Sequence, residues 1–246
     1  MITVLLIGVA LAATAPAQLS PDLNDPRVRV ASQKAVLQGL LDAGLGEDAL
    51  RALASMREAG EDLSPFTVLQ ARALHLNRMP DEALGLLDAY LRTHARDGAA
   101  WALKGVVLAD LDRPAEAVRA LQRANRLTPE DAGVLNNLGY ASLAAGEAEA
   151  AVRHLRAALQ LDPLSTRARN NLGFAYARLD RDAEALTAFR AGSPNESDAR
   201  YNLGVACELR GDRGSAITQY QAAVAARPDH PQAGDALARR LSEEPS

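Results

Sequence analysis

The feature that most constrains this chain is a short run of letters that recurs at a nearly fixed interval. Three segments contain the letters NLG: 134–141 (VLNNLGYA), 167–177 (RARNNLGFAYA) and 200–206 (RYNLGVA). Their glycines, Gly139, Gly173 and Gly204, lie 34 and then 31 residues apart. Self-similarity at such a period indicates a stack of repeated structural units.

The spacing extends beyond the glycines. Each is followed twelve residues later by an alanine and sixteen residues later by a large side chain: Ala151 and Leu155, Ala185 and Phe189, Ala216 and Tyr220. A shift of 34 residues toward the N-terminus gives a fourth set, Gly105, Ala117 and Leu121. Two further shifts give sets without glycine: Ala71, Ala83 and Leu87, then Leu37, Ala49 and Leu53. The pattern therefore predicts six units: 30–63, 64–97, 98–131, 132–165, 166–196 and 197–230.

Each unit contains two stretches of about twelve residues with apolar side chains three and four positions apart, the spacing of an amphipathic helix. Turn residues such as Gly146 separate the stretches, which predicts helical hairpins. A glycine inside a helix costs about 1 kcal/mol relative to alanine. We therefore expect Gly139 and Ala151 to mark a close crossing of paired helices. Leu138 and Leu155 should then fill the space between neighbouring units.

The combined pattern resembles the tetratricopeptide repeat, a motif of 34 residues, over roughly residues 30–230. The unit at 132–165 fills the slots of that motif, with Ser142 in place of its tyrosine: Leu135, Leu138, Gly139, Ala151, Leu155, Ala158 and Pro163. The resemblance implies an all-α fold, an α-solenoid of about six helical hairpins. Residues 231–246 are expected to form a capping helix and tail, with Leu237 and Leu241 facing inward.

The unit at 166–196 is three residues shorter than its neighbours and is followed by an irregular stretch, AGSPNES. Gly192 and Pro194 are expected to end its second helix about one turn early. Either Ser197 or Asn195 should then cap the next helix, because both side chains can accept a hydrogen bond from a free amide at a helix start.

Composition narrows the range of functions. The net charge of −4 gives no general attraction for nucleic acid or anionic lipid. The single cysteine, Cys207, excludes an internal disulfide. It occupies the same slot as Tyr176 in the preceding unit, which predicts a buried and inert thiol.

The histidines fall in different slots of the repeat, so no common site is expected: His75, His94, His154 and His230. No catalytic motif such as H-E-x-x-H occurs. We predict no enzyme activity, no cofactor, no metal and no small-molecule substrate.

The first residues resemble an export signal. Residues 2–15 carry no charge and precede the letters APAQ, which predicts a signal peptide at 1–17 and cleavage before Gln18. The run is too short to cross a bilayer comfortably. We expect an exported, periplasmic chain with an extended lead-in at 18–29; an uncleaved anchor and a misplaced start are the alternatives.

A peptide-binding groove is expected on the first helices of the hairpins, which the resemblance places on the concave side. The candidate residues are Asn136, Asn137, Tyr140, Arg167, Asn170, Asn171, Phe174, Arg178, Tyr201 and Asn202. Asparagine amides can hold a peptide backbone, and the aromatic rings can receive its apolar side chains. Asn136, Asn170, Tyr140 and Phe174 are less dictated by the repeat than the asparagine before Leu-Gly, so they are the sharper candidates.

The sequence thus predicts a non-catalytic protein–protein interaction scaffold that binds a peptide or an amphipathic helix in its concave groove. By analogy with similar exported bacterial proteins, it would assist assembly of a cell-envelope machine such as a type IV or Flp pilus or a secretion system. The alternative is a self-associating structural protein of the envelope, a homo-oligomer in which the capping helix of one chain docks on the exposed end of the next.

Overall fold

The computed structural model describes residues 25–193 and 195–242, and every regular element within them is helical. The predicted signal peptide at 1–17 lies outside these residues. The elements are α1 (Pro26–Asp42), α2 (Gly46–Glu58), a 3-10 turn η1 (Ser64–Phe66), α3 (Thr67–Leu76), α4 (Pro80–Leu91), α5 (Gly98–Asp110), α6 (Pro114–Leu127), α7 (Ala132–Ala144), α8 (Ala148–Leu161), α9 (Thr166–Ala177), α10 (Asp182–Gly192), α11 (Glu196–Leu209), α12 (Arg213–Ala226) and α13 (Ala233–Ser242).

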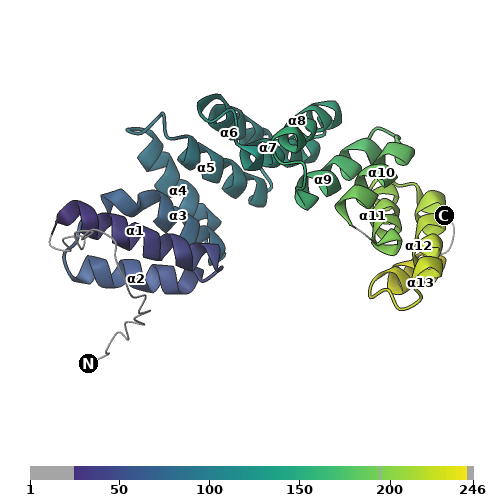
Figure 1. The fold of residues 1–246 in the computed structure, drawn as a ribbon, viewed down its shortest axis with the longest axis horizontal. Coiled ribbons are helices and arrows are strands. Elements are labelled where there is room, and N and C mark those ends of the chain that lie inside the picture. Colours follow the sequence, from purple (N-terminus) through teal and green to yellow (C-terminus); the bar gives the residue numbers. More distant parts are fainter. Residues whose placement is uncertain (1–24, 194, 243–246) are drawn as a thin grey trace, which may run out of the picture.

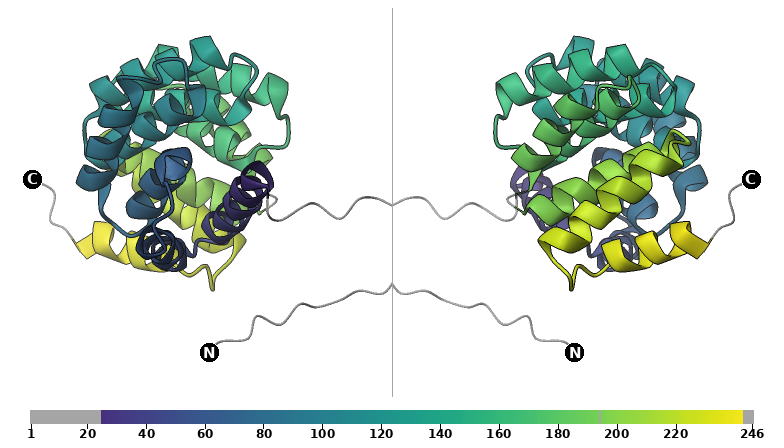
Figure 2. Two further views of the ribbon diagram at one scale, coloured as in Figure 1. Left: turned by 90° about the vertical axis from the view of Figure 1, so that its left-hand side faces the viewer. Right: turned by 90° about the vertical axis from the view of Figure 1, so that its right-hand side faces the viewer.

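Consecutive helices pair into hairpins, from α1 with α2 to α11 with α12, and α13 packs on α12. The predicted all-α solenoid with a capping helix is therefore confirmed. In Figure 1 the hairpins follow one another along an arch, with α5, α7, α9 and α11 on its inner side and α6, α8 and α10 on its outer side. The end-on views of Figure 2 show the same array curving into a superhelix.

Polar caps and glycine turns fix where the helices begin and end. The carboxylate of Asp97 accepts a hydrogen bond from the amide of Ala100 at 2.9 Å, and Asp131 does the same for Val134 at 3.0 Å. Gly146, between α7 and α8, has a φ of +80°, a left-handed conformation that glycine adopts without strain. These local signals explain why helix ends recur at the same place in successive units.

A glycine lies at the closest approach of the two helices in each of the last four hairpins. A Cβ added at Gly139 would lie 2.5 Å from Cγ of Leu155, and one at Gly173 would lie 2.5 Å from Cε1 of Phe189. Gly105 against Leu121 and Gly204 against Tyr220 repeat the arrangement. The predicted close crossing is confirmed, and the partner of each glycine is the large side chain sixteen residues further on.

The leucines that flank this crossing join neighbouring units. Leu138 packs in a cluster with Leu108 and Leu121 of the preceding hairpin. Leu155 packs in a second cluster with Ala168 and Leu172 of the following hairpin. All are buried, so the core runs along the array from unit to unit instead of gathering at one centre.

Two expectations about the ends were wrong. Helix α1 begins at Pro26, inside the segment 18–29 that was expected to be extended, because Asp25 caps it through the amide of Arg27 and proline fits the first helical position. Leu241 is 60% exposed instead of facing inward. The inner face of α13 is formed by Ala233, Ala236 and Leu237, and no further described unit covers the next turn.

The irregular stretch after α10 behaves as predicted. Helix α10 ends at Gly192 after 11 residues, whereas α8 has 14. Of the two candidate caps, Asn195 is the one used: its side chain accepts a hydrogen bond from the amide of Ser197 at 3.0 Å. Pro194 lies outside the described residues.

Candidate peptide-binding groove

The inner helices present a regular stripe of side chains. Its position depends on the glycine at the crossing of each of the last four hairpins, which we call the notch glycine: Gly105, Gly139, Gly173 or Gly204. Because Gly139 faces the second helix of its hairpin, the residues two before, one after and five after it lie on a different side of the helix and form a stripe. In α7 this stripe is Asn137, Tyr140 and Ala144; in α9 it is Asn171 and Phe174, continued by the C-cap residue Arg178. Both stripes line cavities on the inner side of the arch.

The first cavity, which we call the amide pocket, lies between α5, α7 and α9 and has a volume of about 270 Å³. Its walls bring together five of the predicted residues: Asn136, Asn137, Tyr140, Arg167 and Asn171. The remaining lining residues come from α5 and α6: Val106, Ala109, Asp110 and Leu121. Three inner helices of consecutive units therefore contribute to one concave site.

The asparagines of this pocket form a hydrogen-bonded chain. Nδ2 of Asn171 donates to Oδ1 of Asn136 at 3.0 Å, and Nδ2 of Asn136 donates to Oδ1 of Asn137 at 3.2 Å. Asn136 is buried, and these two bonds satisfy both ends of its amide. Asn137 and Asn171 are half-buried, and they retain amide groups that can bind a ligand. The sequence favoured Asn136 over the asparagines that precede Leu-Gly, Asn137 and Asn171. The structure reverses this ranking, because Asn137 and Asn171 are the more accessible residues.

The second cavity, the aromatic pocket, adjoins the first because Tyr140 and Asn171 line both. It has a volume of about 490 Å³ and is closed on its far side by Ala206 and Leu209 of α11. Tyr140 is 50% exposed and Leu209 is 68% exposed, so large apolar groups face solvent here. We refer to the two adjoining pockets together as the groove.

The ring of Phe174 forms the floor of the aromatic pocket. It contacts Phe189 of α10 edge to face, with ring centroids 5.0 Å apart and an interplanar angle of 79°. Such a contact favours one ring orientation. Phe174 is therefore held from behind by its own hairpin while its other face lines the pocket.

Three predicted residues do not line either pocket: Asn170, Tyr201 and Asn202. Asn170, three positions before Gly173, points toward α10, where its Oδ1 lies against Gly192. Tyr201 has the same position relative to its glycine and packs on Tyr220 and His230, with centroids 5.8 and 5.1 Å apart. The sequence reasoning missed Leu209, although it occupies the slot of Arg178 one unit later.

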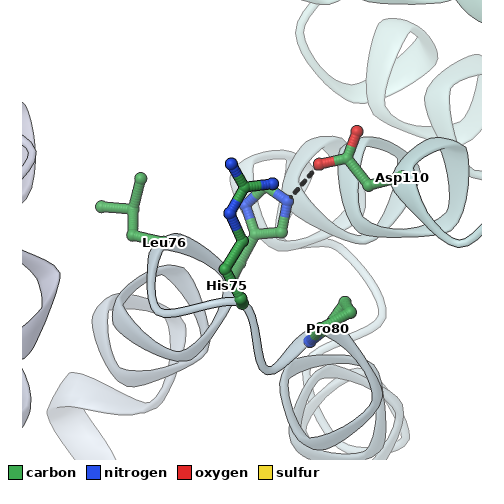
Figure 3. A pocket seen from close by; sticks show the side chains of 5 residues that line it. His75, Leu76, Pro80 and Asp110 are labelled. Atoms are coloured by element: carbon green, nitrogen blue, oxygen red, sulfur yellow. Dashed lines mark hydrogen bonds and ion pairs between the residues drawn. The ribbon is translucent and has the colours of Figure 1, made fainter.

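A third cavity borders the groove near Asp110, at the end of α5. Figure 3 shows His75, from the last turn of α3, directed at Asp110, with Nε2 and Oδ2 2.6 Å apart. The cavity has a volume of about 490 Å³ and is lined by His75, Leu76, Arg78, Pro80 and Asp110. This lining contains no Ser, Thr, Cys or Lys that could serve as a nucleophile beside the histidine. The pair links the last turn of α3 to the end of α5.

Cys207 is buried, and burial raises the pKa of its thiol to about 11, so the thiol stays protonated at neutral pH. No cluster of His, Cys, Asp or Glu among residues 25–193 and 195–242 could hold a metal ion. The same residues include no helix that is both long and apolar enough to cross a membrane.

Comparison with known protein families and structures gives a consistent result. Residues 62–194 match the model of the bacterial transcriptional activator domain, and residues 183–231 match a tetratricopeptide repeat. No curated protein sequence matches the chain.

Solved structures similar to this chain are also repeat proteins. YrrB, described as a TPR protein with an unusual peptide-binding site, is 25% identical with a TM-score of 0.55, over 75% of this chain and 96% of its own. MamA from Desulfovibrio magneticus RS-1 (residues 41 to the end) is 25% identical with a TM-score of 0.56, over 67% of this chain and 93% of its own. The Cut9–Hcn1 structure is 22% identical with a TM-score of 0.63, and covers 90% of this chain and 45% of its own.

Proposed function

Since the chain belongs to the family of the bacterial transcriptional activator domain and is built of tetratricopeptide repeats, we propose that it is a non-catalytic scaffold that binds a segment of another protein in its groove. Repeat proteins of this type bind protein or peptide partners on their concave surfaces. The name of the family refers to transcription, but a net charge of −4 gives this chain no general attraction for nucleic acid.

One observation carries this proposal: large apolar side chains lie exposed on the inner helices next to accessible amides. Tyr140 and Leu209 are half or more exposed, and Phe174 lies between them in the aromatic pocket. Clustered exposed apolar groups with a polar rim are typical of protein interaction sites. The likeness to YrrB, a peptide-binding repeat protein, supports the same function.

Site-specific photo-crosslinking in the native cell tests this function. With a benzoylphenylalanine in place of Tyr140, we expect a discrete crosslinked partner that mass spectrometry maps to one segment. The same group in place of Gln122, an exposed residue of the outer helix α6, is the matched control and should not give that product. Identical products at both positions, or none at Tyr140, would contradict binding in the groove.

The finer role that we propose is assistance in assembling a cell-envelope machine, such as a type IV or Flp pilus or a secretion system. Its support is the analogy with exported bacterial repeat proteins and the uncharged run at residues 2–15. Fractionation of the native cell, with the intact mass of the recovered chain, tests it. A periplasmic form that begins at Gln18 is expected; a form that retains residues 1–17 in the cytoplasm would contradict export.

A second candidate function, self-association, is favoured by apolar groups at the two ends of the array. Val36 on α1 is 62% exposed and Leu241 on α13 is 60% exposed. Contact between unlike ends would join chains head to tail. Light scattering should then show a mass that grows with concentration and that Leu241→Glu reduces to the monomer; a constant monomeric mass would reject this candidate.

A further inference from the structure

We propose that the groove selects an extended peptide segment in which an apolar stretch is flanked on both sides by carboxylates. This inference rests on the proposed function, because it names the chemistry of the partner for the same groove. It adds a requirement for negative charge at two defined places, which a purely apolar groove would not impose.

The positive charges come from one stripe of α9. Arg167, Asn171, Phe174 and Arg178 are spaced by four, three and four residues, so they follow one another along a single face of the helix. Arg167 lies in the amide pocket and Arg178 in the aromatic pocket, and both are exposed. Each end of the groove therefore carries a guanidinium group.

Neither arginine has an ion-pair partner among the described residues, unlike many others in the molecule. Arg113 pairs with Glu116, Arg190 pairs with Glu196, and Arg210 is held by Asp182. The one carboxylate that lines the groove is Asp110 in the amide pocket, and its Oδ2 is engaged by His75. Arg178 is the one charged side chain in the lining of the aromatic pocket. Charge complementarity thus calls for carboxylates on the ligand.

The spacing of the two arginines defines the length of the ligand. Eleven residues of α-helix separate their Cα atoms by about 16 Å. A peptide in extended conformation covers that distance in about five residues. An extended segment also has free backbone amides and carbonyls, which the unused groups of Asn137 and Asn171 can bind, whereas the backbone of a helical ligand is already paired. We therefore expect two acidic residues about five positions apart, with apolar residues between them directed at Tyr140 and Phe174.

Selection from a library of random twelve-residue peptides displayed on phage tests this inference on the chain from Gln18 to Ser246. Three targets are compared: the unmodified protein, a double variant Tyr140→Ala/Phe174→Ala, and a double variant Arg167→Gln/Arg178→Gln. A fourth target, Arg57→Gln/Arg153→Gln, carries the same change of charge at exposed sites away from the groove, on the second helices α2 and α8 of their hairpins. Circular dichroism confirms that each variant is folded before selection.

The expected peptides carry Asp or Glu on both sides of an apolar core and lose binding to Tyr140→Ala/Phe174→Ala. Each groove arginine should contribute about two- to fivefold in affinity, the range for an accessible ion pair, so the arginine double variant should weaken binding about tenfold. The outer control variant should bind within twofold of the unmodified protein. Raising the salt concentration should reduce the advantage of the unmodified protein over the arginine variant.

The remaining outcomes separate this inference from the proposed function. Peptides that depend on Tyr140 and Phe174, yet show no acidic enrichment and bind the arginine variant equally, would overturn the inference while the groove function stands. Selected peptides that ignore Tyr140 and Phe174, or the absence of any selected peptide, would contradict both.

Discussion

The last four hairpins and the first two hairpins are built from the same repeat but pack differently. In the hairpins from α5 to α12 the first helix carries a glycine against a large side chain of the second, for example Gly139 against Leu155. At the same position α3 has Ala71 and α1 has Leu37. The two helices of each glycine-containing hairpin are correspondingly in more extensive contact than α1 with α2 or α3 with α4. Removing one Cβ therefore changes how closely two helices can approach.

The comparison also explains where the groove lies. The four inner helices that line it, α5, α7, α9 and α11, are the four that carry the notch glycine. Because the glycine fixes one face of the helix against its partner, it fixes which side chains point into the groove. The amide and aromatic pockets are thus a consequence of the packing behind them.

Among changes at the glycines, the largest effect is expected from filling a notch with a bulky side chain. Gly139→Leu should lower the free energy of unfolding by about 1–3 kcal/mol, because the new side chain must displace Leu155 from the space that it fills. Thermal melting followed by circular dichroism measures the loss. An unchanged melting temperature would mean that α7 and α8 can move apart without a loss of stability, and it would contradict the importance of the close crossing.

A smaller change at a notch should still be harmful. Gly173→Ala adds one methyl group 2.5 Å from Cε1 of Phe189, and we expect a net loss of about 1–2 kcal/mol even though alanine favours helix. Gly85 of α4 is the matched control, since a Cβ added there would meet no atom of a neighbouring element within 4 Å. Gly85→Ala should raise stability by up to about 1 kcal/mol. Urea unfolding measures both free energies of unfolding. A change of the same sign for Gly173→Ala and Gly85→Ala would contradict the distinction between a crowded and an open glycine.

Converting the other region toward the notched type is a third test. Ala71→Gly removes a buried methyl group from α3 at the position where α7 has Gly139. We expect a loss of about 1 kcal/mol, because glycine is less favourable than alanine inside a helix by that amount. Leu87, in the same core cluster as Ala71, is already fully buried, so it gains no burial from the change. A gain in stability would show instead that α3 and α4 can close into the notched packing.

The smallest effect concerns the joint between α10 and α11. The guanidinium groups of Arg190 and Arg200 hold the pKa of Glu196 at about 2, below its ordinary value of 4.5. Because the pKa is lower in the folded state than in the unfolded state, ionised Glu196 stabilises the fold at any pH above the unfolded-state pKa of about 4.5. This contribution is lost as the pH falls from about 4.5 to about 2.

Since the side chain of Glu196 is 41% exposed and its ion pairs are screened by solvent, we expect its contribution to be only about 0.2–1 kcal/mol. The stability difference between the unmodified chain and Glu196→Gln should therefore be largest above pH 5 and disappear near pH 2. Glu149→Gln on α8, at an exposed site, is the control and should show a smaller difference. A difference for Glu196→Gln that does not change with pH would contradict this role.

Much of the fold could be predicted from the sequence because the packing is periodic. The glycine notch and the burial of Cys207 could be predicted because each residue occupies a slot that recurs at a fixed spacing. The early end of α10 could be predicted because its unit departs from that spacing. The start of α1 at Pro26 was missed because Asp25 and Pro26 lie before the first clear period, although both are signals for a helix start.

The groove was predicted less completely. Asn170 and Tyr201 were chosen as accessible residues, but Oδ1 of Asn170 lies against Gly192 of α10 and the ring of Tyr201 packs on Tyr220 of α12. Asn136 has the same position relative to its glycine, yet it bonds to Asn171 of the next hairpin. The ring of Tyr201 also contacts His230, which lies in the connection between α12 and the capping helix α13. Periodicity determines which residues share a face; only the packed neighbours determine which face is left open.

A double-mutant cycle between Gly139 and Leu155 tests the central claim, that a small residue against a large one sets the packing of the hairpins behind the groove. Leu155→Ala alone should cost about 2–5 kcal/mol, because it leaves a cavity. Gly139→Ala alone should also destabilise the chain. The double variant should lose less than the sum of the two by about 1 kcal/mol or more in urea unfolding, because the new methyl group occupies space that the leucine has left. Losses that simply add would mean that the two residues do not pack against each other, and would contradict the account.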